Sequence, residues 1–518
     1  MLSPLTPFQP NRVYRQLSPG ADRAAAGEAT EAADQAADQV ALSGRSERPV
    51  VEDLTELLRR SVGPIPSAHF CIFGATGDLV SKRSVRDALV ELAEGDRLVP
   101  GQHALILMGS KPSSGAAYLE RFRQGDADSK PISESGFEKF RALTSLQEEG
   151  STVLGVNLTR SEDFQQIQAD VGSKNAVFLA AVPPKAYKPL LENLKSSGLS
   201  ESPENGAFRR ILLEKPFGQD SAAARELAET VQRDFEPGQV LLIDHFLGYP
   251  GMSHMLQFKA HPEVDEALQS QHVERVEVKL LETIKSNDRP YFRDTGILKD
   301  MTQNHAMQIL STLAMDLPSR VTSEQLRLQR QRAAEAVEVL PETVVRGQFS
   351  GFNDPLQGAP EGSSPSQAET FVAFDLKVGL PRWEGVNFHL INAKGVEQKR
   401  SGVDVHLRSL PKALAERLGV RADQSATMRF TVNGKAGIEV VTPEKTVAIP
   451  LDPQIPNQAA YSGLLASAAQ GESAFFATPG EAVAGWRVSD AVEAAWSERP
   501  MVYYTAGTPH DQVGRNGD

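Results

Sequence analysis

The fold of this chain is decided by residues 68–79, which read Ala-His-Phe-Cys-Ile-Phe-Gly-Ala-Thr-Gly-Asp-Leu. The apolar run ends at Gly74, a helical pattern follows over residues 81–94, and a second apolar run covers residues 104–108. Strand, glycine turn, helix and strand form one βαβ unit. Apolar strands that alternate with helices predict a parallel sheet covered on both faces. Such runs recur at residues 176–182, 210–213 and 240–243.

The second half of the chain has a different pattern. Residues 273–281 alternate between apolar and polar side chains, as a half-exposed antiparallel strand does. Residues 296–313 read as a helix. Similar alternation recurs at residues 386–391, 403–407, 428–432 and 437–441. The sequence therefore predicts an α/β, Rossmann-type dinucleotide-binding domain over residues 66–244. A larger α+β domain with a mainly antiparallel sheet follows over residues 245–508.

Both ends of the chain are predicted to lie outside these domains. Ten of the 21 residues from Ala21 to Ala41 are alanine, with no apolar stripe to bury. Residues 1–65 are therefore predicted to form a disordered tail, and residues 509–518 a short C-terminal tail. Residues 351–367 are rich in Gly, Pro and Ser and predict a surface loop.

Length, charge and cysteine content exclude several classes of protein. The chain has 518 residues, and single cores stop growing near about 250–300 residues. The formal net charge of −13 argues against nucleic acid as the main partner, because phosphate backbones are bound by dense Lys/Arg surfaces. The one cysteine, Cys71, does not indicate an oxidising compartment. With no apolar run of about 18 residues and no signal-peptide layout, we expect a soluble cytoplasmic protein without a membrane partner.

The glycine turn is the first candidate site. Gly74-x-x-Gly77 lets the backbone approach a pyrophosphate, and the following helix supplies free N–H groups and a positive dipole end. A tight turn alone would explain two glycines, but their place after the first strand of a βαβ series favours nucleotide binding. Residues 181–184, Ala-Val-Pro-Pro, end another strand. They are either a plain turn or a wall beside the cofactor.

Polar residues also close two of the predicted strands. Lys215 and Asp244 follow the strands at residues 210–213 and 240–243, which places both at the carboxyl-end rim of the sheet. A solvated lysine is the commoner case, but two polar residues at the end of a buried strand, Asp244 and His245, are expected to face a crevice.

The helical segment holds a candidate base. His305 follows Gln303 and Asn304, and histidine is the commonest general base, although a structural histidine is the alternative. Asp300 lies five residues earlier, about 140° away on an α-helix. No His, Cys and carboxylate cluster has metal-ligand spacing, so no metal is predicted. The absence of a Gly-x-Ser-x-Gly elbow likewise gives no sign of a serine hydrolase.

Taken in order, these segments resemble the glucose-6-phosphate dehydrogenase family. The family has Gly-Ala-Ser-Gly-Asp-Leu at residues 74–79 (here with Thr76), Glu-Lys-Pro-Phe-Gly at 214–218 and Asp-His-Tyr-Leu-Gly-Lys at 244–249. The family also has Ala-Leu-Pro-Pro at the end of a strand, which matches residues 181–184. It has a helix that carries Gly-Ile, then Asp, then Gln-Asn-His, which matches residues 296–305. The similarity continues through Ala393-Lys394-Gly395 to Tyr504-Thr505-Ala506-Gly507, so it covers residues 68–508.

The resemblance implies an enzyme that oxidises the C1 hydroxyl of β-D-glucose 6-phosphate to 6-phosphoglucono-δ-lactone, the first step of the pentose phosphate pathway. It implies NADP as hydride acceptor, His305 as general base and Asp244 as the carboxylate that orients it. The residues implied at the cofactor are Gly74, Thr76, Gly77, Asp78, Leu79, Lys111 and Lys215. Those implied at the substrate are Lys215, His245, Glu282, Asp300, Lys394 and Lys399.

Three positions depart from the family. Tyr249 stands where the family has a phosphate-binding lysine, and Phe246 where it has a phosphate-facing tyrosine. When a bound anion lacks one charged hydrogen-bond partner, its binding is weaker by about 1.5–3 kcal/mol. Lys399 or Arg400 is a possible replacement for the missing cation. The family's Gly-Tyr-Ala-Arg-Ser is Gly-Ser-Lys-Pro-Ser at residues 109–113, where Lys111 favours NADP while NAD stays possible.

These departures keep two other functions open. One is a dehydrogenase for a different aldose or sugar phosphate, which Tyr249 and Phe246 suggest. The other is a catalytically weak nucleotide-binding regulatory paralogue, which retention of His305, Asp244 and Lys215 disfavours. The family also implies a homodimer or homotetramer. Some relatives hold a second, structural NADP, and its residues are not traceable in this sequence.

Overall fold

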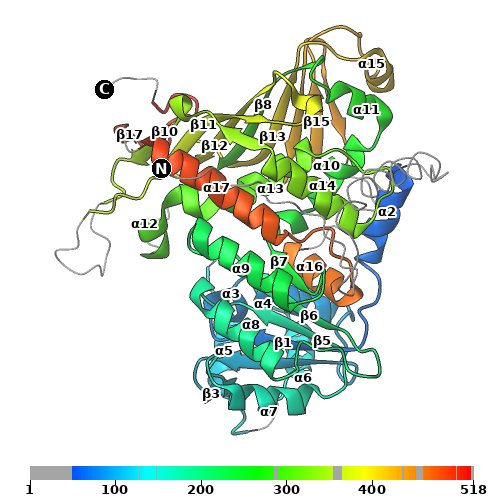
Figure 1. Ribbon diagram of the computed structural model, residues 1–518, viewed down its shortest axis with the longest axis vertical. Coiled ribbons are helices and arrows are strands. Elements are labelled where there is room, and N and C mark those ends of the chain that lie inside the picture. Colours follow the sequence, from blue (N-terminus) through cyan, green and yellow to red (C-terminus); the bar gives the residue numbers. More distant parts are fainter. Residues whose placement is uncertain are drawn as a thin grey trace, which may run out of the picture. The chain divides into compact units, whose positions relative to one another are not determined.

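The computed structural model of the chain describes residues 50–127, 129–146, 149–284, 290–353, 365–434, 437–450, 459–496 and 499–514. Its first sheet has seven strands in the order β3-β4-β2-β1-β5-β6-β7 (Figure 1). All neighbours pair in parallel except β3 and β4. The strands are β1 (Ala68–Phe73), β2 (His103–Gly109), β3 (Ser113–Ser114), β4 (Thr152–Gly155), β5 (Ala176–Ala180), β6 (Arg209–Glu214) and β7 (Val240–Ile243).

Helices cover both faces of this sheet because its strands are apolar on both sides. On β1, Phe70 and Ile72 face one buried cluster and Cys71 and Phe73 face the other. The first cluster includes α4 (Ser84–Glu94), α5 (Gly115–Gln124), α6 (Glu134–Ala142) and, from far along the chain, α16 (Ala460–Gln470). The second includes α7 (Ser161–Val171), α8 (Tyr187–Ser196) and α9 (Ser221–Asp234). The predicted Rossmann-type sheet is confirmed.

The second sheet is mainly antiparallel, also as predicted. Its order is β16-β15-β14-β13-β8-β12-β11-β10-β17, with β9 paired to β11. Only the β8–β12 and β10–β17 pairs are parallel among the described strands. The strands are β8 (Val273–Leu281), β9 (Val337–Val339), β10 (Val345–Phe349), β11 (Phe371–Val378), β12 (Asn387–Ala393), β13 (Arg400–Leu407), β14 (Ala426–Thr431), β15 (Gly437–Val441), β16 (Thr446–Ile449) and β17 (Val502–Tyr504).

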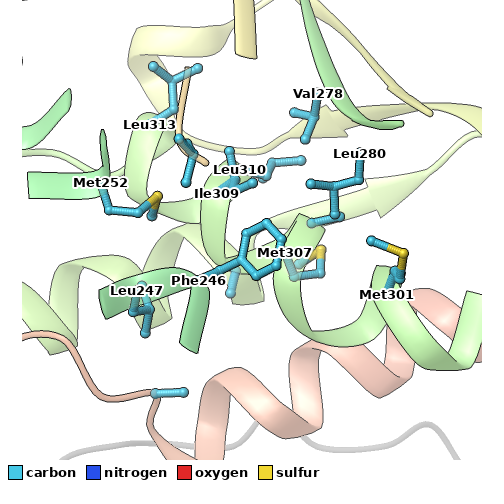
Figure 2. Packing of buried hydrophobic residues seen from close by; sticks show 14 of the residues in the cluster. Phe246, Leu247, Met252, Val278, Leu280, Met301, Met307, Ile309, Leu310 and Leu313 are labelled. Atoms are coloured by element: carbon cyan, nitrogen blue, oxygen red, sulfur yellow. The ribbon is translucent and has the colours of Figure 1, made fainter. Parts of the chain in front are cut away.

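The helices that position the site pack against this sheet. Figure 2 shows Val278 and Leu280 of β8 above Met301 and Met307, and Ile309, Leu310 and Leu313 of the following helix belong to the same apolar cluster. The helices are α10 (Pro250–Lys259), α12 (Pro290–Ile297), the π-helix η3 (Leu298–Ala306), α13 (Met307–Ala314), α14 (Ser323–Glu335) and α17 (Pro479–Trp496). Shorter helices are α3 (Asp78–Ser81), η2 (His245–Gly248), α11 (Pro262–Ala267) and α15 (Lys412–Leu418).

The N-terminal tail predicted from the sequence is too long. Residues 1–49 lie outside the described residues, but helix α2 (Val50–Arg60) follows them. Leu54, Leu57 and Leu58 on one face of α2 are buried, and the helix packs on α10. These leucines are three and four residues apart, so they form a short apolar stripe that the alanine-rich segment before them lacks.

The predicted C-terminal tail is partly packed as well. Val513 is buried, whereas residues 515–518 and most of the predicted loop at 351–367 lie outside the described residues. In the part of the chain that the structure describes, no helix has the length and apolar content needed to cross a bilayer.

Candidate active site

The glycine turn after β1 brings three strand ends together. Gly74 has φ +79°, and a Cβ there would overlap the carbonyl oxygen of Ala181, which follows β5. The Ala75 N–H donates to the Met108 carbonyl on β2 (2.8 Å). A Cβ on Gly109, at the end of β2, would lie 3.0 Å from Thr76. The carboxyl ends of β1, β2 and β5 therefore pack closely around this turn, and only glycine fits at position 74. In sheets of this type a dinucleotide binds at these strand ends.

Cations surround this turn. Lys111 is exposed beyond the end of β2, and Asp78 at the start of α3 pairs with Arg121 of α5 (2.7 Å) and with Lys82 (3.4 Å). Burial raises the pKa of Asp78, but Arg121 and Lys82 bring it below its usual value. Arg121 was not foreseen, because nothing in the sequence links a residue of α5 to the turn 43 positions earlier.

His305 and Asp244 meet as the sequence and the family resemblance suggest. His305 Nδ1 lies 2.6 Å from Asp244 Oδ1, and both side chains are buried. Burial raises the pKa of Asp244, but His305 holds it below its usual value, so the carboxylate is ionised and can only accept. In the neutral form of the ring, this contact places the proton on Nδ1 and the lone pair on Nε2.

Asp300 lies nearer to His305 than an α-helix would place it. The segment is a π-helix, in which hydrogen bonds join residues five apart, so Asp300 and His305 come toward the same face. The predicted 140° separation is therefore wrong. Asn304 supports this turn by donating its Nδ2 proton to the Asp300 carbonyl (2.9 Å).

Four charged side chains from both domains form one network. Lys215 Nζ lies 3.2 Å from Asp300 Oδ1, and Lys394 Nζ lies 3.9 Å from Asp300 Oδ2. Lys394 also makes a close ion pair with Glu282, which follows β8. Burial raises the pKa of Asp300, but Lys215 and Lys394 lower it to about 2. Burial lowers the pKa of Lys215, but Asp300 and Asp244 raise it above its usual value. The Lys215–Asp300 ion pair therefore stays charged at neutral pH.

The residues after β7 form an aromatic wall beside the base. Phe246 is buried and stacks on the His305 ring, with ring centroids 4.2 Å apart. His245 stands edge-on to His305 at 4.6 Å, and Tyr249 stands edge-on to His245 at 5.7 Å. Burial and the neighbouring His305 lower the pKa of His245 to about 3, so this imidazole is neutral. Burial and the nearby Asp244 raise the pKa of Tyr249 to about 12, so its hydroxyl is neutral too.

Lys399 and Arg400, the two cations that could replace the missing lysine, differ in their exposure and in their ion pairs. Lys399 is exposed just before β13. Arg400 makes a close ion pair with Asp404 on the same strand, and Asp404 also pairs with Lys279 of β8 (3.1 Å). Arg400 is therefore already ion-paired with a carboxylate of the second sheet.

Several supporting residues were missed by the sequence reasoning. Trp486 of α17 donates its indole N–H to the Phe217 carbonyl (3.0 Å), beside Lys215. Tyr504 donates to the Lys394 carbonyl (2.6 Å). Glu214 is buried, and burial raises its pKa to about 7 against the opposing effect of Tyr461. Glu214 and Tyr504 lie in stretches that resemble the family, but the partners of Tyr504 and Trp486, 110 and 269 positions away, have no signal in the sequence.

Spacing in the sequence did not reveal two groups of metal-ligand type. The ligand atoms of Asp244, His245 and His305 lie within 4.8 Å of one another, and those of Glu277, Asp404 and His406 do the same. The first group is the His–Asp pair described above. The acidic members of the second group are paired with lysine and arginine, which offsets their charge.

Removing a hydride from an alcohol requires a group that takes the hydroxyl proton. His305, held beside Asp244 at the carboxyl-end rim of a sheet of the dinucleotide-binding type, is the candidate for this group, and the fold and site are together those of an NAD(P)-dependent dehydrogenase. Residues 71–252 match the family described as Glucose-6-phosphate dehydrogenase, NAD binding domain. Residues 256–513 match Glucose-6-phosphate dehydrogenase, C-terminal domain. The chain belongs to the glucose-6-phosphate dehydrogenase family.

Similar proteins agree with this membership. Glucose-6-phosphate 1-dehydrogenase of Chlamydia pneumoniae is 24% identical over 489 residues, which cover 86% of this chain and 94% of that protein. Glucose-6-phosphate 1-dehydrogenase 2 of Mycobacterium bovis is 27% identical over 500 residues, 89% of this chain and 94% of that protein. The crystal structure of glucose-6-phosphate 1-dehydrogenase from Mycobacterium avium shares the fold, with a TM-score of 0.70, 24% identity and coverage of 86% and 96%.

Proposed function

We propose that this chain oxidises β-D-glucose 6-phosphate at C1 to 6-phosphoglucono-δ-lactone with NADP. The observation that carries the proposal is the His305–Asp244 pair, 2.6 Å apart and buried, which leaves the imidazole Nε2 free to accept the C1 hydroxyl proton. Asp244 then stabilises the imidazolium that forms. A positioned general base contributes a rate factor of about 10²–10⁴.

The charged network supports sugar binding by the same site. Glu282 and Asp300 offer carboxylate oxygens to sugar hydroxyls, and Lys215 and Lys394 keep the Asp300 carboxylate ionised. Lys215, which follows β6 in the dinucleotide-binding domain, is proposed to contact both sugar and cofactor. His245, as a neutral imidazole, and the exposed Lys399 are the proposed partners of the 6-phosphate.

The cofactor is proposed to bind over Gly74, Thr76 and Gly77 at the turn. Further contacts are assigned to Asp78, Leu79, Lys111 and Lys215. When bound, NADP supplies the hydride acceptor. Asp78 is shared by two cations, Arg121 and Lys82, so with the exposed Lys111 this end of the site has a net positive charge that suits a 2′-phosphate, and NADP is preferred to NAD.

One observation favours a second substrate class. Phe246 packs on the catalytic ring, and Tyr249 presents a neutral hydroxyl where the family has a lysine. The alternative is therefore a dehydrogenase for another aldose or sugar phosphate.

The test follows absorbance at 340 nm with NADP or NAD and a panel of aldoses with and without a 6-phosphate. We expect turnover of glucose 6-phosphate with NADP. His305→Asn should lower kcat by about 10²–10⁴. His389→Asn is the matched control, because His389 makes the same kind of contact with Asp375 (2.5 Å) on the second sheet. Turnover of unphosphorylated aldoses alone supports the alternative. Nucleotide binding without any turnover refutes both and supports a regulatory paralogue.

A further inference from the structure

The π-helix that carries Asp300 and His305 begins without a capping side chain of its own. Gly296 precedes it with φ +72°, and Ile297 at its N-cap makes no side-chain cap hydrogen bond. The first N–H groups of a helix need partners from elsewhere. Here both come from one residue: Leu298 N–H donates to Glu369 Oε1 (2.8 Å), and Ile297 N–H donates to the Glu369 carbonyl (2.9 Å).

Glu369 fits this place closely. Its side chain is 6% exposed, and a Cβ on Gly296 would overlap both of its carboxylate oxygens. Only glycine at position 296 therefore leaves room for the carboxylate. A negative charge at a helix N-terminus is favoured by the helix dipole, most strongly where the site is partly buried.

The residue after Glu369 holds the other side of the substrate site. The Thr370 carbonyl accepts the Lys394 N–H (2.8 Å), and the Thr370 hydroxyl lies 2.8 Å from the Tyr504 hydroxyl. Tyr504 in turn donates to the Lys394 carbonyl (2.6 Å). Residues 369 and 370 thus tie the helix of the base and the turn of Lys394 to one short segment ahead of β11.

We propose that Glu369 is a positioning residue, whose carboxylate caps the π-helix and sets where Asp300 and His305 lie. The helix, the turn of Lys394 and strand β11 then move as one body. The kinetic consequences rest on the proposed dehydrogenase function, whereas the cap itself does not.

The charge of Glu369 is poised to change near neutral pH. Burial raises its pKa to about 7, against the hydrogen bond from Leu298. Glu369 borders a cavity of about 620 Å³, and the charged groups that line the cavity beside it are Arg293, Asp294, Lys299, Arg346 and Glu493. Of these, Glu493 raises the pKa and Lys299 lowers it, and the two are themselves paired at 3.0 Å. Because the pKa of the packed carboxyl lies above its usual value, protonation favours the packed state, so the helix start should loosen as pH rises through about 7.

Two variants separate charge from hydrogen bonding. Glu369→Gln keeps an oxygen that can accept the Leu298 N–H, and Glu369→Ala removes it. Thr322→Val is the matched control, because Thr322 caps α14 by accepting the Gln325 N–H (3.1 Å) away from the site. We measure hydrogen exchange of residues 297–305, affinity for NADP and steady-state kinetics, each between pH 6 and 8.

In Glu369→Ala, exchange of residues 297–305 should quicken about tenfold and kcat should fall by about the same factor, with unchanged NADP affinity. Glu369→Gln should restore most of kcat and should remove the pH dependence of exchange near pH 7. Thr322→Val should change neither. The proposal would be overturned if Glu369→Ala showed normal exchange and normal kcat. It would also be overturned if Thr322→Val quickened exchange and lowered kcat as much as Glu369→Ala does. If the wild-type protein turns over no sugar, the proposed function fails while the exchange data still decide the cap.

Discussion

Asp244→Asn is the sharpest perturbation of the proposed mechanism. The change keeps the size of a fully buried side chain and an oxygen that can accept from His305 Nδ1, but removes the charge that faces the ring at 2.6 Å. The Phe246 N–H, which donates to the same oxygen (3.0 Å), keeps its acceptor too. The variant therefore tests the carboxylate charge with little change in packing.

The size of the effect follows from the geometry. Two unit charges about 4 Å apart attract by about 4 kcal/mol at an effective dielectric constant of about 20. The imidazolium exists after proton abstraction, so this attraction is lost from the transition state and not from the bound substrate. At about 1.36 kcal/mol for each factor of ten, kcat should fall about 10³-fold. KM and nucleotide affinity should change little.

The assay is steady-state NADPH formation at 340 nm, with nucleotide affinity measured separately. Asp375→Asn is the control, because it removes the same charge from the His389 contact on the second sheet (2.5 Å) and should leave kcat unchanged. Deuterium at C1 of the sugar should slow turnover by Asp244→Asn at least as much as it slows turnover by the wild type, because the proton transfer accompanies hydride removal. A fall in kcat below tenfold, or an equal fall in Asp375→Asn, would refute the assignment of Asp244.

The remaining predictions concern the substrate, the cofactor and stability. Tyr249→Lys should lower KM for glucose 6-phosphate and leave KM for glucose unchanged; an unchanged KM would mean that the phosphate binds elsewhere or is absent from the substrate. Lys111→Glu should raise KM for NADP more than KM for NAD, and equal changes would remove Lys111 from the 2′-phosphate. Arg330→Met leaves the buried Glu481 carboxylate without its ion-pair partner, whose Nε lies 2.6 Å from Oε1. The free energy of unfolding measured in urea should therefore fall by about 3–5 kcal/mol, and the double variant Arg330→Met, Glu481→Leu should recover part of this loss. Glu214 has its pKa raised to about 7 in the folded state, so its contribution to stability is present below about pH 4.5 and is lost as pH rises through 7. The wild type should therefore lose up to about 3 kcal/mol relative to Glu214→Gln between pH 5 and 8, and parallel pH curves would contradict the shift.

Local patterns in the sequence predicted the parts of the fold that depend on them. The apolar run that forms β1 ends at Gly74, and the run that forms β2 lies between Gly101 and Gly109, so the first βαβ unit was predictable. Lys215 and Asp244 were placed at the rim because each follows a buried strand directly. For His305 the residues alone left a structural role open, and the role of general base came only from the family resemblance and stays a proposal.

Features that depend on contacts between distant segments could not be read in this way. The π-helix at residues 298–306 differs from an α-helix in how its turns are held, and no side-chain pattern distinguishes the two. The cap on that helix comes from Glu369, 71 residues away, and looks like any glutamate before a strand. Helix α2 has only three buried leucines, too short a stripe to stand out beside an alanine-rich segment.

The balance of charges at the site bears on how a phosphate group of the substrate could be bound. Lys215 and Lys394 carry the positive charge around the proposed sugar site, and Asp244, Asp300 and Glu282 carry one more negative charge than these two supply. His245 is neutral and cannot offset the difference. A lysine at position 249, as in the family, would balance it, whereas Tyr249 leaves it in place. A phosphate dianion must therefore draw on Lys399, whose exposed side chain is well screened by salt. Binding of glucose 6-phosphate should accordingly weaken with ionic strength far more than binding of an uncharged aldose.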